Sequence, residues 1–370
     1  MPSDPAMRRS DVEAKQAAII PILAAMGVES ILLLMPSHVA WFTAGLNVRG
    51  LFADSERPGI YTNGRQRWLL CSNADSQRFF DEELDQLGFQ LKEWRWDAGR
   101  SDLLASVTAG KRVAADRPFP GTPMANDHLR PLLRLLSPFE QEQLQALGSA
   151  VVHAVEATAR NCEQGQTEQE IAGQLGHRLL HRGIEPAAVS VAADQRGDTY
   201  RRPGFGPISV ARTAVIQATG HRDGLYATCS RTVCFGPLPA EFRVAHDLAV
   251  KQAVLCRSLT RPAITIGEVG MAGRVVLAGT THEFDWRLCP PGYGTGRFPA
   301  EELRRAGQED PLSAGMALVW QPRVGPAAVV DTLIVTDGEP IVVTPPEDWP
   351  VKRLAVRNGP YHEIADVLVL

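Results

Sequence analysis

Apolar runs alternate with segments of helical spacing in the first third of the chain. Residues 11–27 place apolar side chains at helical spacing and end in Gly27, a residue suited to the position after a helix. The following pattern predicts a helix near residues 75–87 and buried strands at residues 31–35, 68–71, 89–96 and 112–115. This alternation predicts an α/β domain over residues 1–136, with a central sheet covered by helices.

The pattern changes at Ser137, where a long helix over residues 138–161 is predicted, with Ser137 as its N-cap. A second helix follows Thr167, which has the spacing of a capping box with Glu170, and ends at Gly183. Later apolar runs predict strands at residues 189–193, 214–218, 228–235, 317–320 and 329–335, and helices at 240–259 and 267–279. Residues 287–312, rich in Gly, Pro and Arg, are expected to form a loop. Residues 137–370 are therefore expected to form a second domain, of the α+β class.

Composition narrows the possible partners. The 370 residues carry a formal net charge of −4 with both signs dispersed, so no basic track indicates nucleic acid or a membrane surface. Six cysteines without a Cys-x-x-Cys pair suit free thiols in a reducing compartment. Because the N-terminus shows no secretory pattern, we expect a cytoplasmic protein.

Six short motifs follow one another in the second domain. They are Ser137-Pro138-Phe139-Glu140, Gly165 to Ile171, Gly224 to Gly236, Pro291-Gly292-Tyr293-Gly294-Thr295-Gly296, Trp320-Gln321-Pro322 and Val330 to Thr336. Together these motifs resemble the pita-bread family of methionine aminopeptidases, aminopeptidase P, prolidase and creatinase. The resemblance implies an N-terminal creatinase-like α/β domain (1–136), a C-terminal pita-bread catalytic domain (137–370), and a homodimer in which the neighbouring N-terminal domain borders each active site.

The metal ligands of that family are missing. Two hard divalent cations sharing a hydroxide need two Asp, one His and two Glu in the family's site. By motif, these positions fall on Ala218, Thr228, Tyr293, Gln321 and Val330, with one residue missing between the first two. A rebuilt zinc site would have to use His221, Asp223, Cys229 and Cys234, which do not provide three convergent ligands. We therefore expect no metal cofactor.

Polar side chains take the place of the ligands. The motifs predict a cavity lined by Tyr200, Arg201, Arg202, Thr228, Tyr293, Trp320, Gln321 and Arg323, with Arg49 of the neighbouring N-terminal domain as a further anchor. Guanidinium groups bind carboxylate and phosphate in pairs of hydrogen bonds, so a small anionic substrate is expected. The catalytic candidates are Tyr293, Arg202 and His221; Tyr293 could transfer protons if a neighbouring arginine lowers its pKa. Which of Arg201 and Arg202 faces the cavity stays open.

Structural roles are the competing interpretation for several of these residues. Arginines of the site could pair with Asp194, Asp198 or Asp331, and Arg231 is expected to be a buried structural residue. Tyr293 could simply fill the space left by the metals. His221 could be a solvated turn former, and Cys229 an inert thiol.

Two functions of different classes follow. The first is a metal-independent, creatinase-like enzyme acting on a small anionic amide or amino-acid-derived metabolite, by C–N bond hydrolysis or a related acid/base reaction. The creatinase mechanism itself does not transfer, because Arg201 or Arg202 stands where the resemblance implies a catalytic His. The second is a catalytically inactive pseudopeptidase that binds a peptide or protein in the old cleft. An aminopeptidase with displaced metal ligands is a third, weaker alternative.

Overall fold

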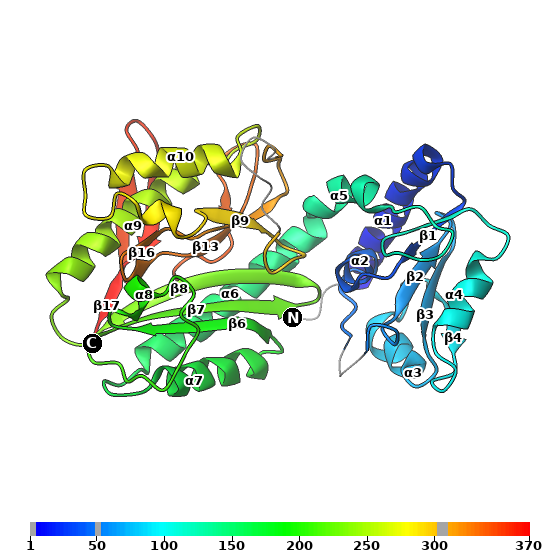
Figure 1. Ribbon diagram of the computed structural model, residues 1–370, viewed down its shortest axis with the longest axis horizontal. Coiled ribbons are helices and arrows are strands. Elements are labelled where there is room, and N and C mark those ends of the chain that lie inside the picture. Colours follow the sequence, from blue (N-terminus) through cyan, green and yellow to red (C-terminus); the bar gives the residue numbers. More distant parts are fainter. Residues whose placement is uncertain (1–4, 49–52, 302–309) are drawn as a thin grey trace. The chain divides into compact units, whose positions relative to one another are not determined.

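The structure is a computed structural model that describes residues 5–48, 53–301 and 310–370. The chain divides into two compact units, Met1–Glu140 and Gln141–Leu370 (Figure 1). The division falls in the first turn of helix α6, just beyond the boundary that the sequence pattern suggests.

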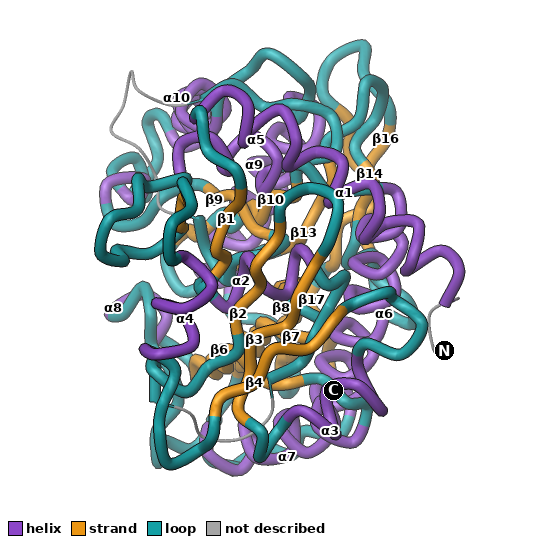
Figure 2. The backbone as a smooth tube through the Cα atoms, turned by 90° about the vertical axis from the view of Figure 1, so that its right-hand side faces the viewer, coloured by secondary structure: helices purple, strands orange, loops and turns teal. Residues whose placement is uncertain are grey.

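The N-terminal unit is built on a five-stranded mixed sheet in the order β4-β3-β2-β1-β5 (Figure 2). Its strands are β1 (Ser30–Leu33), β2 (Gly59–Thr62), β3 (Arg67–Ser72), β4 (Gln90–Trp94) and β5 (Val113–Ala115). Its helices are α1 (Pro5–Met26), α2 (Pro36–Phe42), α3 (Ser76–Arg78), the π-helical turn η1 (Phe79–Glu83), α4 (Ser101–Thr108) and α5 (Asn126–Arg134).

Alternate residues of the central strand face different helices, as expected for a sheet covered on both sides. Ile31 and Leu33 of β1 pack in one core with side chains of α1, α2 and α5, and Leu32 packs in a second core with α4. The predicted strands and the α/β class are confirmed. The helix predicted over residues 75–87 is wrong in its extent, because α3 passes into a π-helical turn that ends at Glu83.

The C-terminal unit contains two four-stranded sheets, in the orders β17-β8-β7-β6 and β14-β13-β10-β9. Its strands are β6 (Glu185–Ala193), β7 (Thr213–Arg222), β8 (Leu225–Cys234), β9 (Gly292–Thr295), β10 (Ala317–Trp320), β11 (Arg323–Val324), β12 (Ala327–Ala328), β13 (Asp331–Ile334), β14 (Ile341–Val342), β15 (Val351–Ala355), β16 (Tyr361–Ala365) and β17 (Val367–Val369). Its helices are α6 (Pro138–Arg160), α7 (Glu168–His181), α8 (Arg196–Thr199), α9 (Ala240–Leu259), α10 (Ile266–Leu277) and the 3-10 turn η2 (Asp285–Arg287).

The predicted helix starts are confirmed. The Ser137 hydroxyl accepts the Glu140 N–H (3.2 Å), and Thr167 and Glu170 form a capping box at α7. The loop predicted over residues 287–312 is wrong for residues 292–295, because these form strand β9 against β10. This strand carries Tyr293.

The two sheets of this unit join where β8 meets β13. The Thr228 N–H donates to the Thr332 hydroxyl (2.8 Å), and the Ser230 N–H donates to the Val330 carbonyl (3.0 Å). Helices α6 and α7 lie along the β6–β8 sheet, and α9 and α10 lie by the second sheet (Figure 1). The middle of the β7–β8 hairpin is therefore held between helices on one side and the second sheet on the other.

A buried ion network fixes this junction. Arg231 of β8 is fully buried and donates to Glu156 of α6 (2.9 Å) and to Asp331 of β13 (3.5 Å). Asp331 also accepts from Arg257 of α9 (2.7 Å). Since buried charges are tolerated only when paired, the network ties two helices to both sheets. The structural role expected for Arg231 is confirmed.

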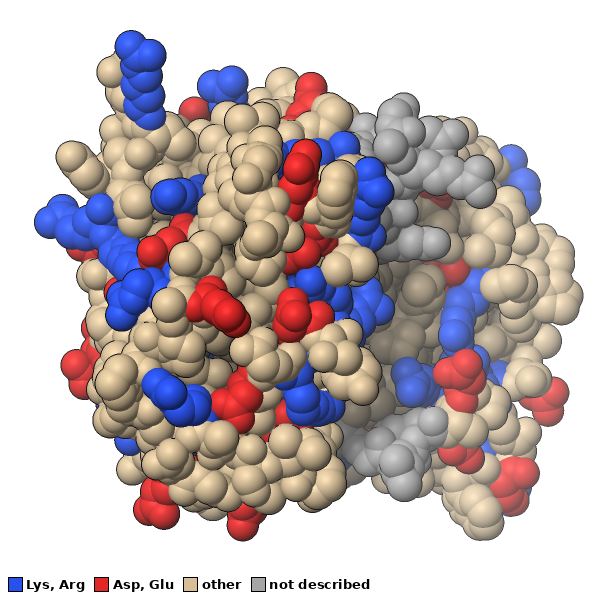
Figure 3. Space-filling model, turned by 60° about the vertical axis from the view of Figure 1, so that its left-hand side comes forward, with Lys and Arg blue, Asp and Glu red and all other residues tan. Residues whose placement is uncertain are grey.

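The surface drawn in Figure 3 carries basic and acidic side chains side by side, without a broad area of one sign. Among the described residues, no helix is both long enough and apolar enough to span a membrane.

We predict that Arg231→Met lowers the free energy of unfolding by about 3–5 kcal/mol, because it removes the nearest cation from the buried Glu156 carboxylate and one of the two guanidinium partners of Asp331. Urea unfolding followed by circular dichroism measures the change. The matched control is Arg353→Met, which removes an exposed ion pair with Glu363 and should cost about 0–1 kcal/mol. A loss for Arg231→Met no larger than the control's would contradict the proposed role of the network.

Candidate functional site

The β7–β8 hairpin has two distinct faces. One face packs on the helices: a Cβ added at Gly220 would lie 2.5 Å from Val151 of α6, and Arg231 on the same face reaches Glu156. Directly opposed residues share a face, and faces alternate along a strand. The other face, which we call the site face, therefore carries Gln217, Thr219, His221, Tyr226, Thr228 and Ser230.

This register revises one ligand position. Ala218 pairs with Cys229, so it lies on the helix-packed face and not beside Thr228. Gln217, in contrast, is on the site face. If Gln217 is the counterpart of the family's first Asp, the spacing to Thr228, the counterpart of the second Asp, no longer lacks a residue. The sequence interpretation overlooked Gln217, although that gap of one residue was the signal that could have identified it.

The remaining ligand positions are occupied by side chains with little capacity to bind a cation. Thr228 is buried, and its hydroxyl lies 2.9 Å from that of Thr219. The Gln321 amide donates to the Pro290 carbonyl (3.1 Å), directly after β10. Val330 is buried in the apolar core. Trp320 is buried as well, and its indole N–H donates to Thr260 (2.8 Å), so it has a structural partner and does not face an open site.

The segment 194–206 presents Tyr200, Arg201 and Arg202. Its shape is fixed by the buried carboxylate of Glu168, which accepts from Ala193, Arg196 and Gly206. Tyr200 is exposed, with the Arg196 guanidinium 5.4 Å from its ring centre.

The two adjacent arginines of this segment differ in their surroundings. Arg201 is paired with Asp285 (3.3 Å) and donates to the Gly325 carbonyl. The carboxylate that pairs with Arg201 is therefore that of Asp285, and not that of Asp194, Asp198 or Asp331. Arg202 is exposed and makes no hydrogen bond or ion pair within the described parts of the chain. Its charge acts on the pKa of Tyr293, Cys289 and Arg323, so Arg202 is the arginine of the pair that remains available to a ligand.

Arg323 is the central cation of the site. Its side chain is partly buried, and its guanidinium donates to the Gln217 amide oxygen on the site face. Within residues 5–48, 53–301 and 310–370, no carboxylate pairs with it. Burial lowers the pKa of Arg323, although the guanidinium stays charged at neutral pH. A partly desolvated cation whose hydrogen-bond partner among the described residues is a neutral amide attracts an anion.

Tyr293 lies beside this cation. Burial raises the pKa of its phenol above the ordinary value, and this outweighs the opposite effects of a hydrogen bond with Thr228 and of Arg323 and Arg202. The neighbouring arginines therefore do not lower the pKa of Tyr293 below its ordinary value, which was the condition for proton transfer by this residue. The phenol is instead a neutral hydrogen-bond donor at neutral pH. Tyr293 also packs against the apolar core of this unit.

His221 lies on the site face toward the hairpin turn. Its Nδ1 is 2.9 Å from the Glu185 carboxylate on β6, and its ring stacks on Tyr226 with centroids 4.4 Å apart. A carboxylate acceptor selects the tautomer protonated at Nδ1, which leaves the Nε2 lone pair free. His221 is therefore an oriented histidine at the end of a strand and not a turn residue.

Two candidates remain, Cys229 and Arg49. Burial raises the pKa of the Cys229 thiol to about 12, so it is an inert thiol, as expected. Arg49 lies outside the described residues.

The donor set does not fit a pair of divalent cations. The five positions hold Gln217, Thr228, Tyr293, Gln321 and Val330, which offer neutral oxygens or none. Arg323 adds positive charge beside them. Among the described residues, no three His, Cys, Asp or Glu side chains converge as a metal site would require.

The sequence profile of Metallopeptidase family M24 matches residues 142–342, more than half of the chain. This protein belongs to metallopeptidase family M24, and its C-terminal unit has the pita-bread fold. Comparison of the sequence with curated proteins gives no match.

Solved structures share the fold over nearly the whole chain. Dipeptidase PepE from Mycobacterium ulcerans is 18% identical, with a TM-score of 0.74 and coverage of 98% of this chain and 99% of that chain. The prolidase from Pyrococcus horikoshii is 16% identical, with a TM-score of 0.76 and coverage of 90% and 99%. The N-terminal domain of FACT complex subunit SPT16 from Cicer arietinum is 10% identical, with a TM-score of 0.66 and coverage of 92% and 97%. At these identities the likeness concerns the fold alone.

We predict that the protein retains well under one ion per chain after incubation with Mn²⁺, Co²⁺ or Zn²⁺ and removal of the excess, because the site offers too few anionic oxygens. Elemental analysis measures the content. A rise in melting temperature with each ion is a second test, since an ion that binds the native state stabilises it. Stoichiometric retention of any of the three ions would contradict our description of the site.

Proposed function

We propose that this chain binds a small carboxylate-bearing amide at the site face and hydrolyses its C–N bond without a metal. The observation that carries the proposal is Arg323, a partly buried guanidinium whose neighbour is the Gln217 amide and which has no carboxylate partner among the described residues. A substrate carboxylate would accept two parallel hydrogen bonds from the Arg323 guanidinium and so provide its anionic partner.

The arrangement of the neighbouring charges supports an anionic ligand. Arg202 adds a second cation without a described acidic partner, whereas Asp285 is occupied by Arg201 (3.3 Å) and by the Gly325 N–H (2.7 Å). A cationic substrate would meet two guanidinium groups that have no carboxylate partner in the described parts of the chain, so the site favours acids over amines.

The acid/base roles follow from His221 and Tyr293. With Nδ1 held by Glu185, the free Nε2 of His221 takes a proton from the attacking water as the C–O bond forms, and returns that proton to the amide nitrogen as the C–N bond breaks, so that the amine and the carboxylic acid leave as products. Tyr293, kept neutral by burial, donates a hydrogen bond to the carbonyl oxygen as negative charge develops on it. These roles require no ion.

We predict that metal-free protein binds N-acetylglycine but not N-acetylglycinamide, which lacks the carboxylate. Arg323→Gln should weaken binding of N-acetylglycine by at least about tenfold, since a charge-assisted hydrogen bond contributes about 1.5–3 kcal/mol. Isothermal titration calorimetry in the presence of EDTA measures both affinities. The matched control is Arg357→Gln, at an exposed position between β15 and β16. Equal affinity for the acid and its amide would argue against the proposed site.

We predict that His221→Gln and Tyr293→Phe each lower the rate of N-acetylglycine hydrolysis by about 10²-fold or more, with little change in its affinity. Release of glycine, followed by NMR, measures the rate. The controls are His177→Gln on the exposed face of α7 and Tyr361→Phe, which is 73% exposed.

Binding without turnover in the wild-type protein would favour the second function, a pseudopeptidase that uses the cleft to hold a partner. In support of this alternative, a domain of a subunit of the FACT complex has the same fold. The homodimer that the family resemblance implies is likewise a proposal. Sedimentation of the purified protein tests it.

A further inference from the structure

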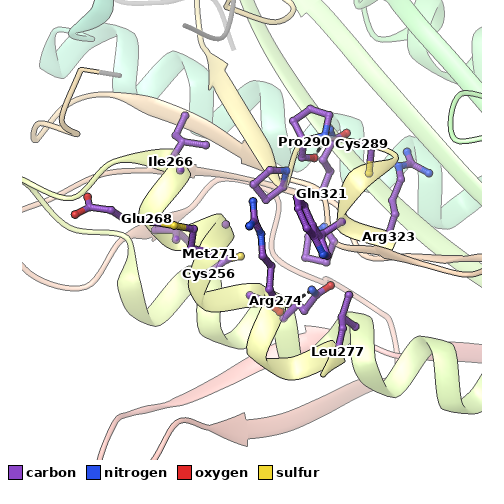
Figure 4. A pocket seen from close by; sticks show the side chains of 18 of the residues that line it. Cys256, Ile266, Glu268, Met271, Arg274, Leu277, Cys289, Pro290, Gln321 and Arg323 are labelled. Carbon is purple, nitrogen blue, oxygen red and sulfur yellow. Dashed lines mark hydrogen bonds between the residues drawn. The ribbon is translucent and has the colours of Figure 1, made fainter. Parts of the chain in front are cut away.

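A cavity of about 560 Å³ lies between helices α9 and α10 and residues 286–291 (Figure 4). Most of its walls are apolar, with Cys256 from α9, Val269 and Leu277 from α10, and Trp286 and Pro290 from the connecting segment. Its volume and lining fall within the range of small-molecule sites, about 300–1,000 Å³. No step of the proposed hydrolysis uses this cavity.

One end of the cavity meets the proposed anion site. Gln321, Arg323 and Cys289 line it, and in Figure 4 Arg323 and Cys289 lie at the opposite end from Ile266 and Glu268. The guanidinium of Arg323 reaches Gln217 on the site face. A ligand whose carboxylate meets Arg323 therefore has this apolar cavity within reach.

The polar groups of the cavity suit a neutral amide more than a second charge. Gln321 donates to the Pro290 carbonyl, while its own amide oxygen accepts no hydrogen bond from the described residues and can accept an amide N–H. Glu268 is engaged at the start of α10, where it accepts the Thr265 N–H (2.7 Å). Arg274 lies flat on Trp286, with its guanidinium carbon 3.4 Å from the ring centre.

We infer that this cavity holds the apolar acyl group of the ligand whose carboxylate Arg323 binds, so that the substrate class is N-acyl amino acids with an apolar or aromatic acyl group. This inference rests on the proposed anion site. It adds that affinity rises with the apolar surface of the acyl group, because that surface leaves water on entering the cavity.

The test compares two probes, N-acetylglycine and N-benzoylglycine, by calorimetry on the metal-free protein. The wild-type protein should bind the benzoyl compound about tenfold more tightly, from the burial of its ring. Gly273→Met should abolish this gain and leave the affinity for N-acetylglycine unchanged. Gly273 is buried on α10 and lines the cavity, and a Cβ added there would meet only the Gln252 amide at 3.7 Å, so the longer side chain enters the cavity.

Two further variants serve as controls for the effect of Gly273→Met on folding and on the helix. Val275→Met adds a similar side chain to α10 at a residue that is 76% exposed and outside the cavity lining, so it should keep the benzoyl preference. Gly273→Ala, which favours the helix and adds one methyl group, should reduce the preference in part even if the methionine variant fails to fold.

The outcomes separate the two proposals. If N-acetylglycine binds through Arg323 but the benzoyl preference is missing, or persists in both Gly273 variants, the cavity assignment is overturned and the anion site stands. If neither probe binds the wild-type protein, or if Arg323→Gln leaves both affinities unchanged, both proposals are overturned.

Discussion

The buried ion network around Arg231 is the constraint on which the C-terminal unit depends. It joins α6, α9, β8 and β13 through buried charges that satisfy one another away from water, and removal of Arg231 would take a cation from both Glu156 and Asp331. Because this network holds the helix-packed face of the β7–β8 hairpin, the residues of the opposite face are presented at fixed positions. The fold has thus kept its frame while the chemistry of the site face has changed.

The two faces of the hairpin differ in how their charges are balanced. On the helix-packed face, Arg231 has two carboxylate partners. On the site face, Arg323 has a neutral amide from Gln217. The family resemblance implies anionic oxygens around cations at this site, whereas this chain places there a guanidinium without a carboxylate partner among the described residues. The proposed anionic ligand follows from that difference in charge.

The sequence predicted the frame better than the site. The starts of α6 and α7 could be predicted from the sequence, because the residues that cap a helix lie within four positions of one another. The buried structural role of Arg231 could be predicted from the motif that contains it. Strand β9 was missed, since its Gly-rich segment becomes a strand only by pairing with β10. The contact between Arg323 and Gln217 joins residues 106 positions apart and depends on where the β11–β12 pair lies relative to β7, which no local pattern encodes. The one-residue error at Ala218 placed a ligand position on the wrong face, as a shift of one along a strand must do.

We propose that the positions corresponding to the family's metal ligands surround an anion-binding site in this chain. Anomalous diffraction from one crystal soaked with both 3-bromobenzoate and MnCl₂ tests it most directly, with data collected at the bromine and manganese edges. We expect a bromine peak near the Arg323 guanidinium, on the side of the cavity between α9 and α10, and no manganese peak among Gln217, Thr228, Tyr293 and Gln321. A manganese peak at those residues, with no bromine near Arg323, would contradict the account.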